Sequence, residues 1–126
     1  MDIGDVFQGD LGKGRHNYVV LSHPTEDICV VTAMISTWDE RRKDDSCIIW
    51  GSDGHPSITH ESYVVYAEAF IVKISTIEKR IRERSITPKV PFSDILIERV
   101  LKGVAKSPYF PSKCFIILDR QNIWPE

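Results

Sequence analysis

The run SYVVYAEAFIVKI, which begins at Ser62, constrains the fold more than any other part of the sequence. It is rich in β-branched and aromatic residues, so it predicts one long strand. Alternate residues of a strand point to opposite faces, and here both sets are largely apolar. The strand is therefore expected to be covered on both sides or to curl through a barrel.

Several shorter segments ahead of this run also have the composition of strands. They are GDVF (4–7), NYVVLSH (17–23), ICVVTAMIST (28–37) and SCIIW (46–50). The turn-forming sequence PTED joins the second to the third and predicts a hairpin. Because the strands follow one another without intervening helices, a doubly wound parallel sheet is disfavoured. The pattern favours a small, strongly curved antiparallel barrel.

The hydrophobic period changes after the long strand. The sequence Ser75-Thr76-Ile77-Glu78 matches the capping box S-x-x-E and predicts a helix through EKRIRERS. Thr87-Pro88 is expected to end this helix, and Pro91 to keep the linker extended. A second helix is expected from Ser93, where SDILIERVLKGVAK carries one apolar stripe at helical spacing.

The apolar run KCFIIL (113–118) is expected to return to the sheet as a final strand. The fold class is thus mainly β (α+β), a curved antiparallel barrel with one or two C-terminal helices. With 126 residues the chain suits a single domain over 1–126. Its barrel strands are expected at about 3–74 and its helices at about 75–106.

Composition indicates where the protein is located more than what it does. The net charge of −2, from 16 basic and 18 acidic residues, argues neither for nor against nucleic acid. The start MDIGDVFQGD lacks the features of a signal peptide, and no apolar run approaches the ~20 residues of a membrane span. We therefore expect a cytoplasmic protein that has no membrane partner.

Several of these pieces, in this order, resemble the N-terminal half of the MazF/PemK growth-inhibitor toxins. They are Gly4-Asp5-Val6, a glycine-bearing loop that ends at Arg15, the strand Val19-Val20-Leu21-Ser22, and Ile35-Ser36-Thr37. The run SYVVYAEAFIVKIS is similar to the next long strand of the family, which opens with a serine and leads toward a helix. The resemblance covers roughly residues 3 to 78.

The resemblance implies an SH3-like barrel, usually a homodimer, that cleaves single-stranded RNA without a metal. An antitoxin or another protein partner belongs to the same expectation. The usual catalytic pair of the family, an arginine and a hydroxyl, corresponds to Arg15 and to Ser36 or Thr37. The sequence departs from the family where His16-Asn17 follows the arginine in place of proline. Residues 85–126 have no counterpart in a minimal toxin.

The residue types also suit this chemistry. Metal-free RNA cleavage uses the 2′-OH as nucleophile, and needs a base, an acid and a cation for the phosphorane charge. Histidine suits the first two tasks and arginine the third. This adds His16 and His60 to the catalytic candidates. The candidates for substrate binding are Lys13, His55 and two tyrosines that can stack on a base, Tyr63 and Tyr66.

Each candidate also has a purely structural reading. His55 precedes Pro56 and suits a turn, while His60 suits a hydrogen bond to a backbone carbonyl near a strand start. Tyr63 and Tyr66 suit the core or rim of a barrel. The remaining polar candidates suit solvated loops and turns.

Other chemistries lack their motifs. GDLGKGR does not match a P-loop, and Cys47 with His55 and His60 matches no zinc-site spacing, so no cofactor and no metal are expected. The leading hypothesis is a toxin-like endoribonuclease. The alternative is a non-catalytic protein-interaction module on the same barrel, since one fold hosts many functions.

Overall fold

The computed structural model describes residues 1–124, so the end of the expected domain, Pro125 and Glu126, lies outside the described residues. Within this range the chain forms six strands and three α-helices. In chain order they are β1 (Val6–Asp10), β2 (Arg15–Val20), β3 (Cys29–Thr37), β4 (Ile48–Ile49), β5 (Ser62–Lys73), α1 (Ile74–Arg82), β6 (Ile86–Lys89), α2 (Asp94–Lys106) and α3 (Ser112–Gln121). A short 3-10 helix, η1 (Gly51–Asp53), follows β4.

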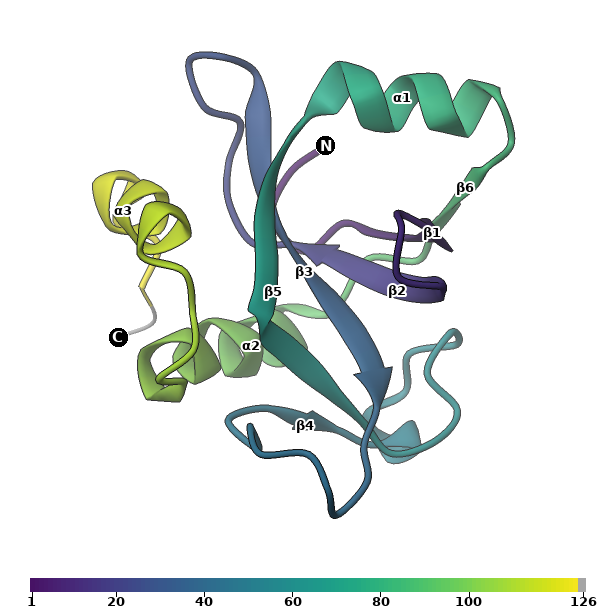
Figure 1. Ribbon diagram of the computed structural model, residues 1–126, viewed down its shortest axis with the longest axis vertical. Helices are drawn as coiled ribbons and strands as arrows, with labels where there is room; N and C mark the ends of the chain where they lie inside the picture. Colours follow the sequence, from purple (N-terminus) through teal and green to yellow (C-terminus); the bar gives the residue numbers. More distant parts are fainter. Residues whose placement is uncertain (125–126) are drawn as a thin grey trace.

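The strands form one antiparallel sheet in the order β4-β5-β3-β2-β1-β6. The sheet is strongly twisted and curls into a half-barrel (Figure 1). This confirms the predicted class, a mainly β fold with a small curved antiparallel barrel and helices. No helix among the described residues is long and apolar enough to cross a membrane.

The long strand β5 bends in the middle, where its register with β3 shifts. Thr32 pairs with Phe70 but Met34 pairs with Val65, so the β5 segment 66–69 stands opposite Ala33 alone. Such a bulge bends a strand and redirects its side chains. The strand contributes Val64, Tyr66 and Ala69 to one core, while Val65, Phe70 and Val72 pack against the other.

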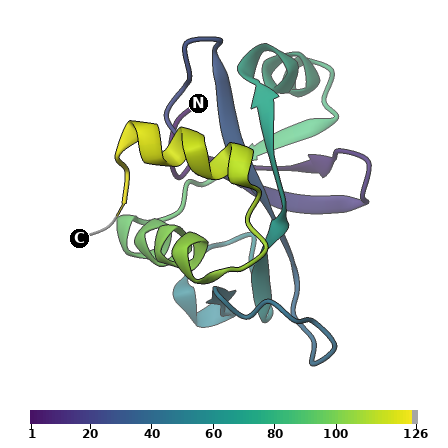
Figure 2. The ribbon, with the colours of Figure 1, turned by 60° about the vertical axis from the view of Figure 1, so that its left-hand side comes forward.

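The two faces of the sheet are covered by different helices. On one face, α2 and α3 lie side by side against the sheet (Figure 2). They contribute Val100, Val104, Cys114 and Leu118 to a core that contains Tyr66. On the other face, α1 covers a second core, built from Phe7, Tyr18, Val20, Val30, Met34, Ile74, Ile77 and Ile86.

The predicted strand at 113–118 is wrong, because this segment lies within the helix α3. The chain enters the helix at Pro111, whose carbonyl accepts from the N–H groups of Cys114 and Phe115. Cys114 and Leu118 are four residues apart and both fully buried, which is the spacing of a helix face. A short apolar run has no clear period, so sequence pattern alone does not separate the two structures.

The start and end of α1 also differ from the prediction. The helix begins at Ile74, one residue before the expected capping box, and its N-cap Lys73 makes no side-chain capping bond. It ends at Arg82, ahead of the expected stop at Thr87-Pro88. The Ile74 N–H donates to the Ile28 carbonyl, so β5 passes directly into the helix. Beyond α1, the expected linker contains the edge strand β6, in which Pro88 pairs with Phe7. An edge strand tolerates proline because one side of its backbone needs no partner.

Candidate functional site

A cleft of about 240 Å³ lies where the ends of three strands meet the loop before β5. We call it the Arg15–His60 cleft. Its walls are Gln8, Arg15, His16, Asn17, Ile35, Ser36, Thr37, Ser57, Ile58, His60 and Ser62. The cleft contains all five residues that the sequence singled out as catalytic: Arg15, His16, Ser36, Thr37 and His60.

Sheet register explains why these residues meet. β2 begins at Arg15, and β3 ends at Thr37, which pairs with Ser62 at the start of β5. Antiparallel neighbours place the start of one strand beside the end of the next. Residues far apart in sequence therefore lie together at one end of these neighbouring strands.

The loop between η1 and β5 forms the far wall of the cleft, and two side chains hold it in place. The Asn17 Nδ2 atom donates to the Ser57 carbonyl at 3.3 Å. His55 accepts from the Ser57 N–H through Nδ1 at 3.1 Å and donates through Nε2 to the Val90 carbonyl. The hydrogen bonds fix the tautomer of His55 and tie the loop to both β2 and the segment before α2.

His60 projects from this loop and meets the end of β3. Its Nε2 atom lies 2.9 Å from the Thr37 hydroxyl oxygen. Its Nδ1 atom lies 3.5 Å from the Thr59 hydroxyl, at the outer limit for a hydrogen bond. Both His60 and Thr37 are exposed to solvent. The imidazole is therefore oriented by one good contact and accessible to a ligand.

His16 is more tightly held than His60. Its Nδ1 atom lies 3.3 Å from the Ile35 carbonyl oxygen, and its Nε2 atom lies 2.8 Å from the Lys13 carbonyl oxygen. A neutral imidazole carries one N–H, so the tautomer decides which of the two carbonyls accepts a hydrogen bond. Either tautomer fixes the orientation of the His16 ring in the cleft.

Arg15 supplies the positive charge of the cleft. Its Nη2 atom donates to the neutral amide oxygen of Gln8 at 3.2 Å. Among residues 1–124 no ion pair involves Arg15. Because it is exposed, its guanidinium is available to an anion such as a phosphate.

Asn17 adds an unsatisfied acceptor to the same cleft. Its Oδ1 atom is buried and has no hydrogen-bond partner among the described residues. An unpaired buried polar atom costs about 1–3 kcal/mol.

Lys13 and Tyr63, two predicted substrate-binding residues, lie outside the Arg15–His60 cleft. The Lys13 side chain points into a different pocket, where it pairs with Glu68 at 2.9 Å. Tyr63 packs edge-on against Trp38 with a centroid distance of 5.4 Å, and the Arg42 guanidinium lies 5.8 Å from its ring centre.

The other two predicted substrate-binding residues, His55 and Tyr66, are buried and pack inside the protein. The His55 ring packs edge-on against Phe92 at 5.1 Å. Tyr66 is fully buried, and its hydroxyl donates to the Val100 carbonyl of α2 at 2.6 Å. Burial raises the pKa of Tyr66 far above its ordinary value. Neither ring has a free face on which a base could stack.

The sequence reasoning missed Gln8, Asn17, Ser57 and Ser62 as residues of the cleft. Asn17 carried one usable signal, because it is a polar residue that opens the aliphatic strand NYVVL. Ser57 is a loop residue, Ser62 begins β5 and Gln8 lies in the middle of β1, and only the fold brings them to the cleft.

Neither models of known protein families nor curated proteins match this chain. The likeness to MazF/PemK toxins therefore depends on the sequence pieces named above. The geometry of the cleft is an argument independent of that likeness. Within residues 1–124, no group of three or more His, Cys, Asp and Glu side chains is arranged to hold a metal ion.

Proposed function

We propose that the protein is a toxin-like endoribonuclease that cleaves single-stranded RNA without a metal ion, with the Arg15–His60 cleft as its active site. The observation that supports the proposal is the convergence of Arg15, His16, Thr37 and His60 on one cleft. These residue types match the base, acid and cation that the reaction needs.

In the proposed reaction His60 acts as the general base. It removes the proton of the 2′-OH, whose oxygen attacks the adjacent phosphorus. The bond from phosphorus to the 5′-oxygen then breaks, which leaves a 2′,3′-cyclic phosphate on one fragment and a 5′-OH on the other. The Thr37 hydroxyl, 2.9 Å from His60 Nε2, orients the imidazole for this step.

His16 acts as the general acid in the same scheme. It donates the Nε2 proton to the leaving 5′-oxygen, which takes the place of the Lys13 carbonyl. The loop that carries this carbonyl contains two glycines at positive φ, Gly12 at 107° and Gly14 at 85°. Glycine adopts such angles freely, so the loop has the freedom to release His16.

Arg15 binds the phosphate and stabilises the extra charge of the phosphorane. Its guanidinium makes a hydrogen bond to Gln8 but no ion pair with a carboxylate of the described residues. A homodimer, an antitoxin or other protein partner and a cytoplasmic location form part of the proposal, and light scattering of the purified protein tests the first of these.

The decisive experiment is a cleavage assay on a mixed single-stranded RNA in the presence of EDTA. We expect the parent protein to cleave it and to leave 2′,3′-cyclic phosphate ends. Arg15→Ala and His60→Ala should each lose about a hundredfold in rate. Arg82→Ala, which removes an exposed arginine of α1, is the matched control and should cleave like the parent.

Two outcomes contradict the proposal. A folded protein that cleaves no RNA would favour the alternative, a non-catalytic interaction module. The exposure of Phe115 and Ile116 on α3 favours that alternative, since a protein partner would bury them. Cleavage that both active-site variants retain would place the activity outside this cleft.

A further inference from the structure

A second pocket, of about 260 Å³, lies beside the β5 bulge. We call it the Lys13–Glu68 pocket. Its walls are Leu11, Lys13, Tyr18, Met34, Ala67, Glu68, Ala69 and Phe70. Its size lies just below the roughly 300–1,000 Å³ of pockets for drug-sized ligands, so it suits a single planar ring system.

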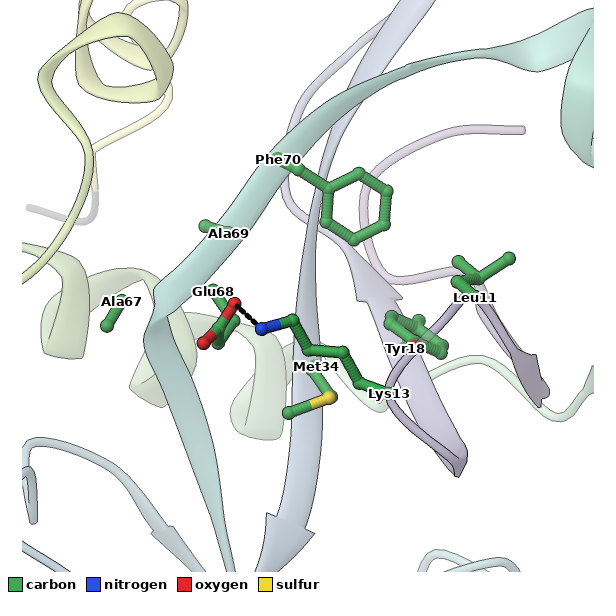
Figure 3. Close-up of a pocket in the computed structure, with 8 residues that line it drawn as sticks. All are labelled: Leu11, Lys13, Tyr18, Met34, Ala67, Glu68, Ala69 and Phe70. Carbon is green, nitrogen blue, oxygen red and sulfur yellow. Dashed lines mark ion pairs between the residues drawn. The ribbon is translucent and has the colours of Figure 1, made fainter.

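The bulge creates the pocket and directs a carboxylate into it. The β5 segment 66–69 stands opposite Ala33 alone, which gives this strand extra length at the bend. Figure 3 shows Glu68 and Phe70 on the side of β5 that faces the pocket, and Ala69 on the opposite side. Bulges near functional sites commonly redirect side chains in this way.

The pocket combines an apolar wall with two opposite charges. Tyr18 and Phe70 lie edge-to-face with a centroid distance of 6.0 Å, and Met34 lies beside them. Lys13 reaches across from the β1–β2 loop to Glu68, and their charged atoms are 2.9 Å apart (Figure 3). Both side chains are more than one third exposed. Such an ion pair contributes little to stability, so a ligand can replace it at low cost.

An adjacent ammonium and carboxylate match the Watson–Crick edge of guanine. Guanine presents the acceptor O6 next to two donors, N1–H and the N2 amino group. A carboxylate accepts from two neighbouring donors, and an ammonium donates to the oxygen beside them. Adenine, cytosine and uracil each lack two adjacent donors. RNA-binding proteins read unstacked bases by aromatic contacts and by hydrogen bonds to this edge.

We propose that the Lys13–Glu68 pocket binds a guanine base of single-stranded RNA, with Glu68 accepting from N1–H and N2–H and Lys13 donating to O6. The RNA part of this inference rests on the proposed function, whereas the recognition of guanine does not. The half-buried Phe70 supplies the apolar surface that the base contacts, and the buried Tyr18 and Met34 complete the wall around it.

Lys13 links the two sites. Its side chain lines the guanine pocket, while its carbonyl lies 2.8 Å from His16 Nε2 in the Arg15–His60 cleft. A base that draws Lys13 away from Glu68 therefore acts on the same short loop that holds the proposed general acid. Guanine next to the cleaved bond would favour release of His16.

The test is a titration of the protein with each of the four nucleoside 5′-monophosphates, followed by NMR of the backbone amides. We expect saturable binding of GMP, with shifts centred on Lys13 and on residues 67–70. Binding of AMP, CMP and UMP should be about tenfold weaker. IMP, which lacks only the N2 amino group, should bind several-fold more weakly than GMP.

Charge variants then locate the interaction. Glu68→Gln should remove the preference for GMP over IMP and weaken GMP binding about tenfold. Glu98→Gln is the matched control, because Glu98 forms an equally short and exposed ion pair with Lys102 on α2, and it should bind like the parent. Equal binding of all four nucleotides, or a GMP preference that Glu68→Gln retains, would overturn the proposal.

A short RNA separates the two sources of the base. A single-stranded oligonucleotide with one guanine should bind more tightly than GMP, because its phosphates also meet Arg15. If it binds no better than GMP, the pocket serves a free nucleotide and the RNA part of the inference is wrong. Because this titration measures binding rather than cleavage, GMP recognition by a protein that cleaves nothing would refute only the proposed ribonuclease activity.

Discussion

The Nε2 atom of His60 lies 2.9 Å from the hydroxyl of Thr37, and this contact joins the end of β3 to the loop before β5. If Thr37 orients the proposed base, Thr37→Val should lower kcat about tenfold and leave KM nearly unchanged. Thr37→Ser keeps a hydroxyl and should restore most of the rate. Steady-state kinetics on a short RNA measure both constants.

Thr59 provides the matched control for this prediction. Its hydroxyl lies 3.5 Å from the other ring nitrogen of His60, too far for a strong hydrogen bond. Thr59→Val should therefore leave kcat within about twofold of the parent value. Equal losses in Thr37→Val and Thr59→Val would show that the Thr37 contact has no special role.

Gly103 and Tyr66 are packed too closely for any side chain at position 103. A Cβ atom there would overlap the Tyr66 hydroxyl and lie 3.1 Å from Cys47 Cβ. The hydroxyl cannot move away without losing its 2.6 Å bond to the Val100 carbonyl. Gly103→Ala should destabilise the protein by about 2–3 kcal/mol, which urea unfolding would measure.

A double-mutant cycle tests the cause of this loss. Tyr66→Phe removes the overlapping oxygen, while the ring carbon Cζ stays 2.9 Å from the added Cβ. The variant also loses a buried hydrogen bond and should cost about 1–2 kcal/mol alone. The double variant Gly103→Ala/Tyr66→Phe should lose less stability than the sum of the losses of the two single variants. Strict additivity would mean that the Tyr66 hydroxyl oxygen is not the cause of the loss in Gly103→Ala.

Much of the fold follows from patterns that are local in sequence. The segment from Ser62 is apolar on both faces, and this alone indicates a strand covered on both sides. The run KCFIIL misled because its burial pattern, Cys114 with Leu118, depends on α3 packing against the sheet. A short apolar run suits a strand or a helix equally well until its partner is known.

Some features of the candidate site were also predicted from the sequence, and others were not. Arg15 and Thr37 were predicted as candidates from the resemblance, and His16 and His60 from their residue type. The core position of Tyr66 was one of the two readings of the sequence, but its partner Val100 was not predictable, because it comes from a helix 34 residues later in the chain. The register shift that directs Glu68 into its pocket has no signal in the sequence.

His55 should matter for stability, and for RNA binding only through the loop that it holds against the cleft. It is buried, with one ring nitrogen bonded to the Ser57 N–H and the other to the Val90 carbonyl. His55→Phe keeps the ring beside Phe92 but leaves both backbone groups unpaired. We expect a loss of about 1–3 kcal/mol in urea unfolding. RNA affinity, measured below the unfolding transition, should fall less than in Arg15→Ala, because His55→Phe only loosens the loop that bears His60. A loss as large as that of Arg15→Ala would give His55 a direct role.

The Asp53–Arg99 ion pair predicts a pH dependence of stability. Burial raises the pKa of Asp53, but the Trp50 N–H and the Arg99 guanidinium lower it more, so the pKa lies below its ordinary value of 3.8. A lowered pKa means that the carboxylate stabilises the fold above the ordinary value. This contribution is lost as the pH falls through the lowered pKa.

Asp53→Asn should therefore be less stable than the parent at neutral pH, and the difference should shrink as the pH falls below the ordinary value of 3.8. Thermal unfolding across this range measures the effect. Asp45→Asn, which changes an exposed carboxylate, should show no such trend. A difference for Asp53→Asn that stays constant with pH would exclude the ion pair as its cause.

Ile28 has a backbone conformation that its side chain disfavours. Its φ is 57°, in the left-handed region, and the side chain is 63 % exposed at the β2–β3 turn. The backbone is held there because its N–H donates to the Thr25 carbonyl and its carbonyl accepts from the Ile74 N–H. This conformation costs an ordinary residue about 1–2 kcal/mol, and asparagine and glycine much less. Since little of the side chain is buried, replacing it removes strain and few contacts.

Ile28→Asn should raise stability by about 1 kcal/mol, or the Tm by roughly 4 °C. Ile28→Gly should gain less, because glycine also gives the unfolded chain more freedom. Ile28→Val keeps the branched side chain and should gain nothing. A Tm for Ile28→Asn below that of the parent would mean that the exposed isoleucine makes stabilising contacts that outweigh its strained backbone.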